Sequence, residues 1–226
     1  MTHPIIVFDL DGTLVDTAPD LVDTLNTILT SEGLPSVAYE AARNFVGGGA
    51  RVMVERGFAA AGQVMSTAAI DGFTRAFLDH YAAHIADRSA PFPGVEPVLD
   101  TLAKHGFRLA VCTNKVEKLS VLLLDALGLS KRFAAICGAD TFGIAKPDPE
   151  ALHRTIGRAG ATGGPAVMVG DSITDIATAR AAGIPVVAVD FGYTDTPVTE
   201  LAPDRVISHF GQLPEAVFAL VSRLRS

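Results

Sequence analysis

Two aspartates follow directly after an apolar strand signal near the N-terminus. The four residues before Asp9 are isoleucine, isoleucine, valine and phenylalanine, which is typical of a buried parallel strand. Because Asp9 and Asp11 are two residues apart, both side chains leave the strand end on the same side. Two carboxylates this close favour a cation, and Gly12 allows the backbone to turn. An Asx-type turn before a helix cap explains Asp11 and Gly12, but leaves a buried Asp9 unexplained.

Three further polar clusters occur downstream, and each has an ordinary alternative interpretation. Thr113 and Asn114 follow an apolar run, where they can bind phosphate or cap the next helix. Lys146 is followed by Pro147 and Pro149, which restrict the backbone of its loop. The alternative is that Lys146 is solvated, as a lysine in a loop usually is. Asp171 and Asp175 lie in a GDSITD sequence at a helix start, where acidic residues also cap the helix.

The four polar clusters together resemble the sequence motifs of a known enzyme superfamily. DLDGTLVD at residues 9–16 resembles the first motif of the haloacid dehalogenase-like hydrolase superfamily. The clusters at residues 113–114, 146–149 and 170–175 are similar to its second, third and fourth motifs, in the same order. The resemblance implies phosphomonoester hydrolysis through an aspartyl phosphate.

The same resemblance assigns a role to each motif. It implies that Asp9 is the nucleophile, that Asp11 is the general acid and base, and that Lys146 neutralises the nucleophile and the phosphoryl oxygens. Thr113 and Asn114 are expected to bind the phosphoryl group. A Mg²⁺ cofactor is implied, with these ligands: Asp9, Asp11 through its backbone carbonyl, Asp171, and Asp175 as second ligand or supporting partner. Dehalogenating and phosphonate-cleaving members lack the second acidic residue, so Asp11 favours phosphate transfer.

A glycine-rich segment indicates the substrate. NFVGGGARVMVER at residues 44–56 resembles the cap loop of phosphoglycolate phosphatases, which implies 2-phosphoglycolate as substrate. The three backbone N–H groups of Gly47, Gly48 and Gly49, with Arg51 nearby, would form a second anion site facing the metal. A flexible turn between helices, with Arg51 exposed, remains the alternative.

The pattern of apolar residues predicts how these motifs are positioned. After residue 94, apolar strands alternate with helices, which predicts an α/β fold with a doubly wound, Rossmann-like parallel sheet. The predicted strands are 5–8, 107–112, 133–137, 166–169, 185–189 and 205–207. The predicted helices are 18–32, 38–46, 50–58, 69–87, 95–105, 116–127, 149–158, 173–182 and one from 213. Ligands of such sheets bind beyond the carboxyl ends of the strands.

Helices without intervening strands between residues 16 and 88 predict an inserted all-helical cap domain, because a crossover needs only one helix. The core domain would then comprise residues 1–15 and 89–226, with a linker at 88–94 that contains prolines and a glycine. In the cap, His80 and His84 have a spacing compatible with zinc, but no third ligand pattern accompanies them.

Composition limits the class of partner. The net charge of −7 disfavours nucleic acid and anionic membranes, and no apolar stretch reaches the roughly 20 residues of a membrane-spanning helix. Cys112 and Cys137 lie in apolar runs, so we expect buried free thiols. With no secretory signal evident, we expect a cytoplasmic monomer or homodimer that acts on a small phosphate ester.

Alternatives remain at the level of sequence. A related phosphatase could act on a sugar phosphate or on pyrophosphate. A phosphotransferase similar to β-phosphoglucomutase would move the phosphoryl group between sugar hydroxyls. A non-enzymatic binding protein that kept the fold would be expected to show damage in at least one motif, and none is visible.

Overall fold

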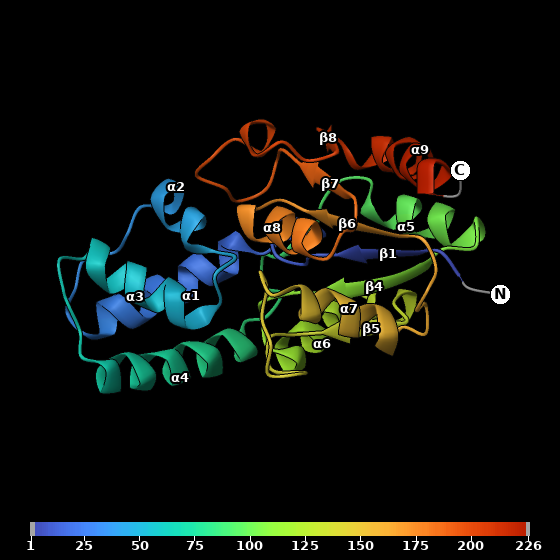
Figure 1. Cartoon of the computed structure of the whole chain (residues 1–226). Helices are drawn as coiled ribbons and strands as arrows, with labels where there is room; N and C mark the ends of the chain where they lie inside the picture. The colour runs from blue at the N-terminus through green and yellow to red at the C-terminus, as the bar shows by residue number, and fades with distance from the viewer. Residues whose placement is uncertain (1–2, 225–226) are drawn as a thin grey trace.

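A six-stranded parallel sheet forms the centre of the computed structural model, which describes residues 3–224 (Figure 1). Its strand order is β5-β4-β1-β6-β7-β8, and every neighbouring pair is parallel. The strands are β1 (Ile5–Phe8), β4 (Arg108–Cys112), β5 (Ala135–Cys137), β6 (Ala166–Gly170), β7 (Val186–Val189) and β8 (Arg205–Ile207). The predicted doubly wound sheet is confirmed, although β4 and β5 begin one and two residues later than expected.

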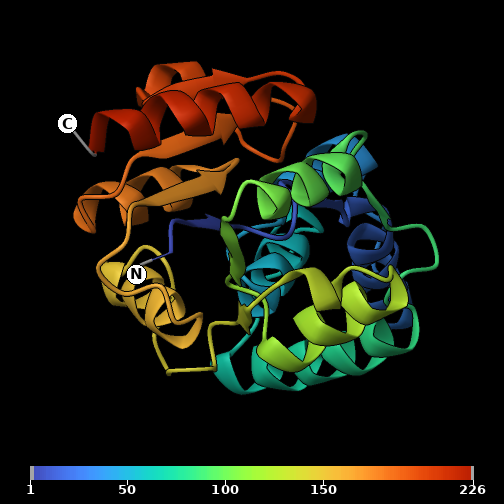
Figure 2. The ribbon, with the colours of Figure 1, turned by 90° about the vertical axis from the view of Figure 1, so that its right-hand side faces the viewer.

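Helices cover both faces of this sheet because its strands are apolar on both sides. In β1, Ile6 and Phe8 belong to one hydrophobic cluster, and Ile5 and Val7 belong to the other. The first face packs against α5 (Val95–Lys104), α6 (Glu117–Ala126) and α9 (Leu213–Leu224), and the second against α7 (Pro149–Arg158) and α8 (Ile173–Ala181). Figure 2 shows α9 and α7 on opposite sides of the sheet.

A separate group of helices lies beyond the carboxyl end of β1, at the left of Figure 1. It comprises α1 (Ala18–Ser31), α2 (Tyr39–Ala42), α3 (Ala50–Ala60) and α4 (Thr67–Ala83). The helix predicted at 38–46 is shorter, because α2 passes into a 3₁₀ turn, η1 (Arg43–Phe45), before Gly47 takes a positive φ of 100°. The helix predicted at 69–87 instead covers 67–83. This arrangement confirms a helical cap over an α/β core.

The chain passes between core and cap twice, and the two connecting segments pair with each other. Strand β2 (Val15–Asp16) pairs antiparallel with β3 (Ala90–Pro91), a two-residue ribbon that the sequence analysis missed. The buried Asp20 carboxylate accepts hydrogen bonds from the backbone N–H groups of Arg88 and Ser89, at 3.0 and 2.8 Å, and from the Ser89 hydroxyl. The domain boundaries at 15/16 and 88/89 remain a prediction, and this ribbon lies beside them.

The remaining elements are short. They are the 3₁₀ turns η2 (Ser130–Arg132), η3 (Val198–Leu201) and η4 (Phe210–Gln212). Cys112 and Cys137 face each other on the neighbouring strands β4 and β5. Both are buried free thiols, which confirms the expectation from the sequence. Within residues 3–224, no helix is both long and apolar enough to cross a membrane.

Candidate active site

The first and fourth motifs meet at the point where the strand order reverses. Asp9 follows β1 and Asp171 follows β6, and these two strands are neighbours in the sheet. The backbone N–H of Asp9 donates to the Val169 carbonyl at 2.9 Å, which fixes the strand end. In doubly wound sheets, ligands bind at the carboxyl ends of the strands at such a reversal. The topology therefore brings residues 162 positions apart to one site.

Three buried carboxylates converge there. Asp9, Asp171 and Asp175 each offer an oxygen, and these oxygens all lie within 4.8 Å of one another. Burial and the neighbouring carboxylates together raise the pKa of Asp9 to about 7, although Lys146 lowers it, and raise the pKa of Asp171 to about 8. When ionised, the three carry a charge of −3 against the +1 of Lys146. A divalent cation would balance this charge, so the residues present fit Mg²⁺.

Lys146 lies inside this acidic cluster. Its Nζ is 2.8 Å from Asp9 Oδ1 and 2.6 Å from Asp175 Oδ1. Burial opposes a charged ammonium, but the carboxylates of Asp175 and Asp9 outweigh it and raise the pKa of Lys146. Asn114 fixes the backbone of Lys146, because its amide accepts from the Lys146 N–H at 2.9 Å and donates to the carbonyl at 3.1 Å. The lysine is therefore charged and held against Asp9.

Asp175 supports the site through its hydrogen bonds. Its Oδ2 accepts from the backbone N–H groups of Asp171 and Ser172 at 3.2 and 3.1 Å, and from the Ser172 hydroxyl at 2.7 Å. Its Oδ1 accepts from Lys146 at 2.6 Å. Both oxygens are thus engaged in orienting Lys146 and the start of α8. By contrast, each Asp171 oxygen accepts one donor, Thr13 Oγ1 at 2.7 Å or the Tyr193 N–H at 2.8 Å.

Gly12 makes room for Asp171. A Cβ atom at Gly12 would lie 2.5 Å from Asp171 Oδ2, and the φ of Gly12 is +82°, which L side chains rarely adopt. Its backbone N–H donates to the Val15 carbonyl at 3.0 Å, which closes the turn after Asp11. The glycine of the first motif is therefore required both by the turn and by the close approach of the fourth motif.

Asp11 faces a second buried lysine. Lys115 Nζ is 2.8 Å from Asp11 Oδ1 and 3.2 Å from Oδ2, and it lies 4.5 Å from the centre of the Tyr81 ring on α4. Burial disfavours the ammonium, but Asp11 outweighs this and raises the pKa of Lys115. Sequence analysis missed Lys115, although it directly follows Thr113 and Asn114. It also missed Tyr81, which lies one helical turn after Phe77 and resembles an ordinary core residue.

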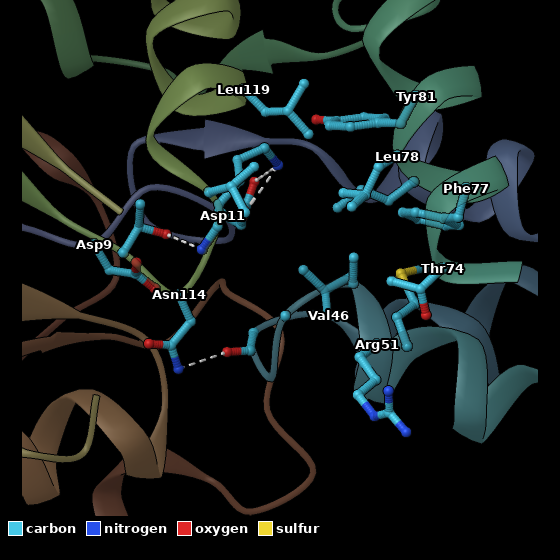
Figure 3. Close-up of a pocket in the computed structure, with 18 residues that line it drawn as sticks. Asp9, Asp11, Val46, Arg51, Thr74, Phe77, Leu78, Tyr81, Asn114 and Leu119 are labelled. Carbon is cyan, nitrogen blue, oxygen red and sulfur yellow. Dashed lines mark hydrogen bonds and ion pairs between the residues drawn. The ribbon is translucent and has the colours of Figure 1, made fainter. Parts of the chain in front are cut away.

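A cavity of about 230 Å³ lies between the strand ends and the cap (Figure 3). Asp9, Asp11 and Thr113 line it from the core. The side chains that α3, α4 and the loop before α3 contribute are mainly apolar: Val46, Met53, Phe77, Leu78 and Tyr81. The hydroxyls of Thr74 and Tyr81 are buried and have no hydrogen-bond partner among the described residues. The cavity therefore joins a charged floor to a mainly apolar wall.

The predicted binding residues occupy different parts of this region. Thr113 lines the cavity, and its Oγ1 accepts a hydrogen bond from the Lys115 N–H at 3.2 Å. Asn114 joins three loops, since its Nδ2 also lies 3.4 Å from the Gly47 carbonyl. Gly49 lines the cavity, whereas Gly48 lines a neighbouring hollow together with Ser172. The substrate contacts of these residues remain predictions.

Arg51 lies at the far end of the cavity from Asp9. Its guanidinium forms ion pairs with Glu55, at 3.0 Å, and with Asp71. In Figure 3 the guanidinium turns away from Asp11. Contact between Arg51 and a bound substrate would require new side-chain positions and stays a prediction.

The two cap histidines have partners of their own. His80 Nδ1 lies 3.2 Å from the Thr24 hydroxyl, and His84 pairs with Asp87 at 2.7 Å. Their rings stack with centroids 4.5 Å apart. Within residues 3–224, the three-carboxylate group is the one cluster with metal-ligand geometry, and neither histidine belongs to it.

Comparisons with known proteins agree with this geometry. A family model described as haloacid dehalogenase-like hydrolase matches residues 6–189. A phosphoglycolate phosphatase of Mesorhizobium japonicum is 54% identical over 94% of both chains, and one of Caulobacter vibrioides is 49% identical over 96% of this chain and 92% of the relative. A solved structure from Haemophilus somnus, described as a predicted phosphoglycolate phosphatase, superposes with a TM-score of 0.86 at 29% identity, covering 94% of this chain and 97% of that one.

Proposed function

The chain belongs to the haloacid dehalogenase-like hydrolases and is a phosphoric monoester hydrolase, and we propose that it converts 2-phosphoglycolate to glycolate and phosphate with Mg²⁺. The observation that carries this proposal is the position of Asp9. It is a buried carboxylate at a strand end, held by Lys146 and open to a small cavity. A nucleophile for phosphorus needs this combination of access and neutralised charge.

In the first step, one Asp9 oxygen attacks phosphorus, the phosphorus–oxygen bond to the substrate breaks, and an aspartyl phosphate forms. Asp11 donates a proton to the leaving alkoxide. In the second step, water attacks phosphorus and gives a proton to Asp11, while the bond between Asp9 and phosphorus breaks. Asp9 is thereby restored and phosphate is released. Lys146 carries a positive charge beside Asp9 throughout and stabilises the charge that develops on the phosphoryl oxygens.

Asp9, Asp171 and the backbone carbonyl of Asp11 would hold the Mg²⁺ ion. When bound, the ion supplies positive charge that lets an anionic carboxylate approach an anionic phosphate. Asp175 would support the site indirectly, because both of its oxygens already accept hydrogen bonds. We propose that it orients Lys146 rather than binding the metal directly.

The proposed substrate rests on three supports. The relatives from Mesorhizobium japonicum and Caulobacter vibrioides, 54% and 49% identical to this chain, both carry the name phosphoglycolate phosphatase. The cavity of about 230 Å³ suits a small phosphorylated acid. The glycine-rich segment at residues 44–56 resembles the loop of such enzymes, and Gly49 lines the cavity.

A substrate panel tests this proposal. Phosphate release is measured with 2-phosphoglycolate, sugar phosphates, nucleotides and pyrophosphate, each with magnesium and with a chelator. We expect the highest kcat/KM with 2-phosphoglycolate and loss of activity with chelator. A preference for a sugar phosphate or pyrophosphate would overturn the substrate and keep the hydrolase. Phosphoryl transfer between sugar hydroxyls would indicate a mutase instead.

A further inference from the structure

The proposed reaction leaves one buried charged group in the cavity without a role. Lys115 is 9% exposed, lines the cavity and lies on the loop that follows β4. A lysine is almost never buried unless it is paired, because desolvation of an ammonium is costly. Its position therefore requires a specific partner at each stage of the reaction.

In this structure the partner is Asp11, the proposed general acid and base. Both Asp11 oxygens lie within 3.2 Å of Lys115 Nζ. While these contacts hold, the carboxylate is directed to the lysine instead of to a leaving oxygen. Removing one member of a buried ion pair leaves the other charge uncompensated, which is strongly unfavourable. Asp11 can thus turn to the substrate only if another anion takes its place beside Lys115.

The surroundings of Lys115 are suited to receive an anion. Tyr81 lines the same cavity, and its hydroxyl is buried and has no hydrogen-bond partner among the described residues. Its ring lies 4.5 Å from Lys115 Nζ. Arg51, the other cation of the cavity lining, is already paired with Glu55 and Asp71. The unpaired Tyr81 hydroxyl and the Lys115 ammonium, whose partner can be exchanged, therefore belong to neighbouring residues of a mostly apolar cavity lining.

We propose that Lys115 binds a carboxylate on the organic part of the substrate, with the Tyr81 hydroxyl as a second donor. The proposal rests on the proposed function, whose substrate carries both a phosphoryl group and a carboxylate. Arrival of the carboxylate replaces Asp11 as the partner of Lys115, and Asp11 turns to the leaving oxygen. A neutral phosphomonoester brings no such replacement, so Lys115 determines specificity and positions Asp11.

Ligand binding tests this role without turnover. The probes are 3-phosphonopropionate and propylphosphonate, which have carbon–phosphorus bonds and differ only in the carboxylate. With magnesium, we expect the wild-type protein to bind 3-phosphonopropionate roughly 10- to 100-fold more tightly in calorimetry. In Lys115→Met the preference should fall below about threefold. Lys118→Met, which removes an exposed lysine from the following helix, is the matched control and should keep it. Retention of the preference in Lys115→Met would overturn the proposal.

Kinetics distinguish a specific role from a structural one. The substrates are 2-phosphoglycolate and 2-hydroxyethyl phosphate, in which a neutral hydroxymethyl group replaces the carboxylate. We expect Lys115→Met to lower kcat/KM for 2-phosphoglycolate at least about 10-fold more than for the neutral ester, and Lys115→Arg to restore part of the loss. An equal loss with both substrates would contradict the assignment.

Tyr81→Phe keeps the ring and tests the hydroxyl alone, in case Lys115→Met does not fold. We expect about a 3- to 10-fold weaker affinity for 3-phosphonopropionate and little change for propylphosphonate. Equal effects on both probes would count against the anion site. If the wild-type protein binds 3-phosphonopropionate preferentially through Lys115 but hydrolyses no phosphomonoester, the proposed function fails while the anion site stands.

Discussion

Two buried lysines face the two aspartates of the first motif, and they are held in different ways. Lys146 lies between two carboxylates, and Asn114 fixes its backbone from both sides. Lys115 has one carboxylate partner and the aromatic ring of Tyr81, which belongs to the cap. A lysine enclosed by core groups is suited to a constant electrostatic role. One that contacts both core and cap is suited to exchange its partner when substrate binds.

Among substitutions that compare the two lysines and their surroundings, the largest effect should follow loss of Lys146. Lys146→Met removes the positive charge beside Asp9, so we expect kcat to fall about 1,000-fold or more. The loss should be similar for 2-phosphoglycolate and 2-hydroxyethyl phosphate, because this charge acts on the phosphoryl group that both share. Steady-state kinetics with both substrates check this. A loss of activity confined to 2-phosphoglycolate would contradict this assignment and would indicate that Lys146, and not Lys115, binds the substrate carboxylate.

An intermediate effect is expected where Lys146 is oriented. Asp175→Asn replaces one acceptor oxygen by an amide donor, which cannot satisfy all four donors around Asp175. We expect kcat to fall about 10- to 100-fold and the free energy of unfolding to fall by about 1–3 kcal/mol. Denaturant unfolding and kinetics measure the two effects. An unchanged kcat in a folded Asp175→Asn variant would show that Lys146 needs no such support.

The acidic cluster predicts how magnesium and pH act together on stability. The folded pKa values of Asp9 and Asp171, about 7 and about 8, lie above the ordinary value of 3.8. The metal-free folded protein therefore holds more protons than the unfolded chain between about pH 4 and pH 8, and its stability falls as pH rises through that window.

Magnesium should counteract this loss, because it binds deprotonated carboxylates. At about 100 times the dissociation constant, we expect it to raise Tm by roughly 5–10 °C at pH 8 and by less at pH 6. Thermal unfolding of wild-type protein and of Asp171→Asn, which should lose the response, measures this. An equal rise at both pH values would count against protonated carboxylates in the metal-free site.

The smallest effect is expected at Arg51. Its guanidinium pairs with Glu55 and Asp71 and is turned away from Asp11, so it contributes little if Lys115 binds the carboxylate. We expect Arg51→Met to raise KM for 2-phosphoglycolate by no more than about threefold, which is the range of exposed ion pairs. A much larger rise, confined to carboxylate substrates, would favour Arg51 over Lys115 as the anion site.

The strand-end motifs were predictable because their signals are local. An apolar strand followed by Asp9 and Asp11 places carboxylates at the edge of a parallel sheet wherever the strand lies in that sheet. Asp171 follows a strand in the same way. The prolines around Lys146 likewise restrict its loop from within a few residues.

The links between cap and core were not predictable in this way. Lys115 and Tyr81 meet across two parts of the fold, and an aromatic residue on an apolar helix face gives no sign that it lines a cavity or that its buried hydroxyl lacks a partner. The β2–β3 ribbon has two residues per strand, too few for a periodic pattern. The ion pair between Arg51 and Asp71 depends on the packing of α3 against α4, so the sequence could not predict it, and the role of Arg51 at an anion site stays a prediction.

The central claim is that Asp9 is the nucleophile, and trapping of the phosphorylated enzyme tests it most directly. The enzyme is mixed with phosphorus-labelled 2-phosphoglycolate and magnesium, quenched in acid within one turnover, digested and analysed by mass spectrometry. We predict a phosphoryl group on the peptide that contains Asp9, and neither phosphorylation nor turnover in Asp9→Asn. A wild-type enzyme that turns over without phosphorylating this peptide, or an Asp9→Asn variant with substantial activity, would contradict the covalent mechanism.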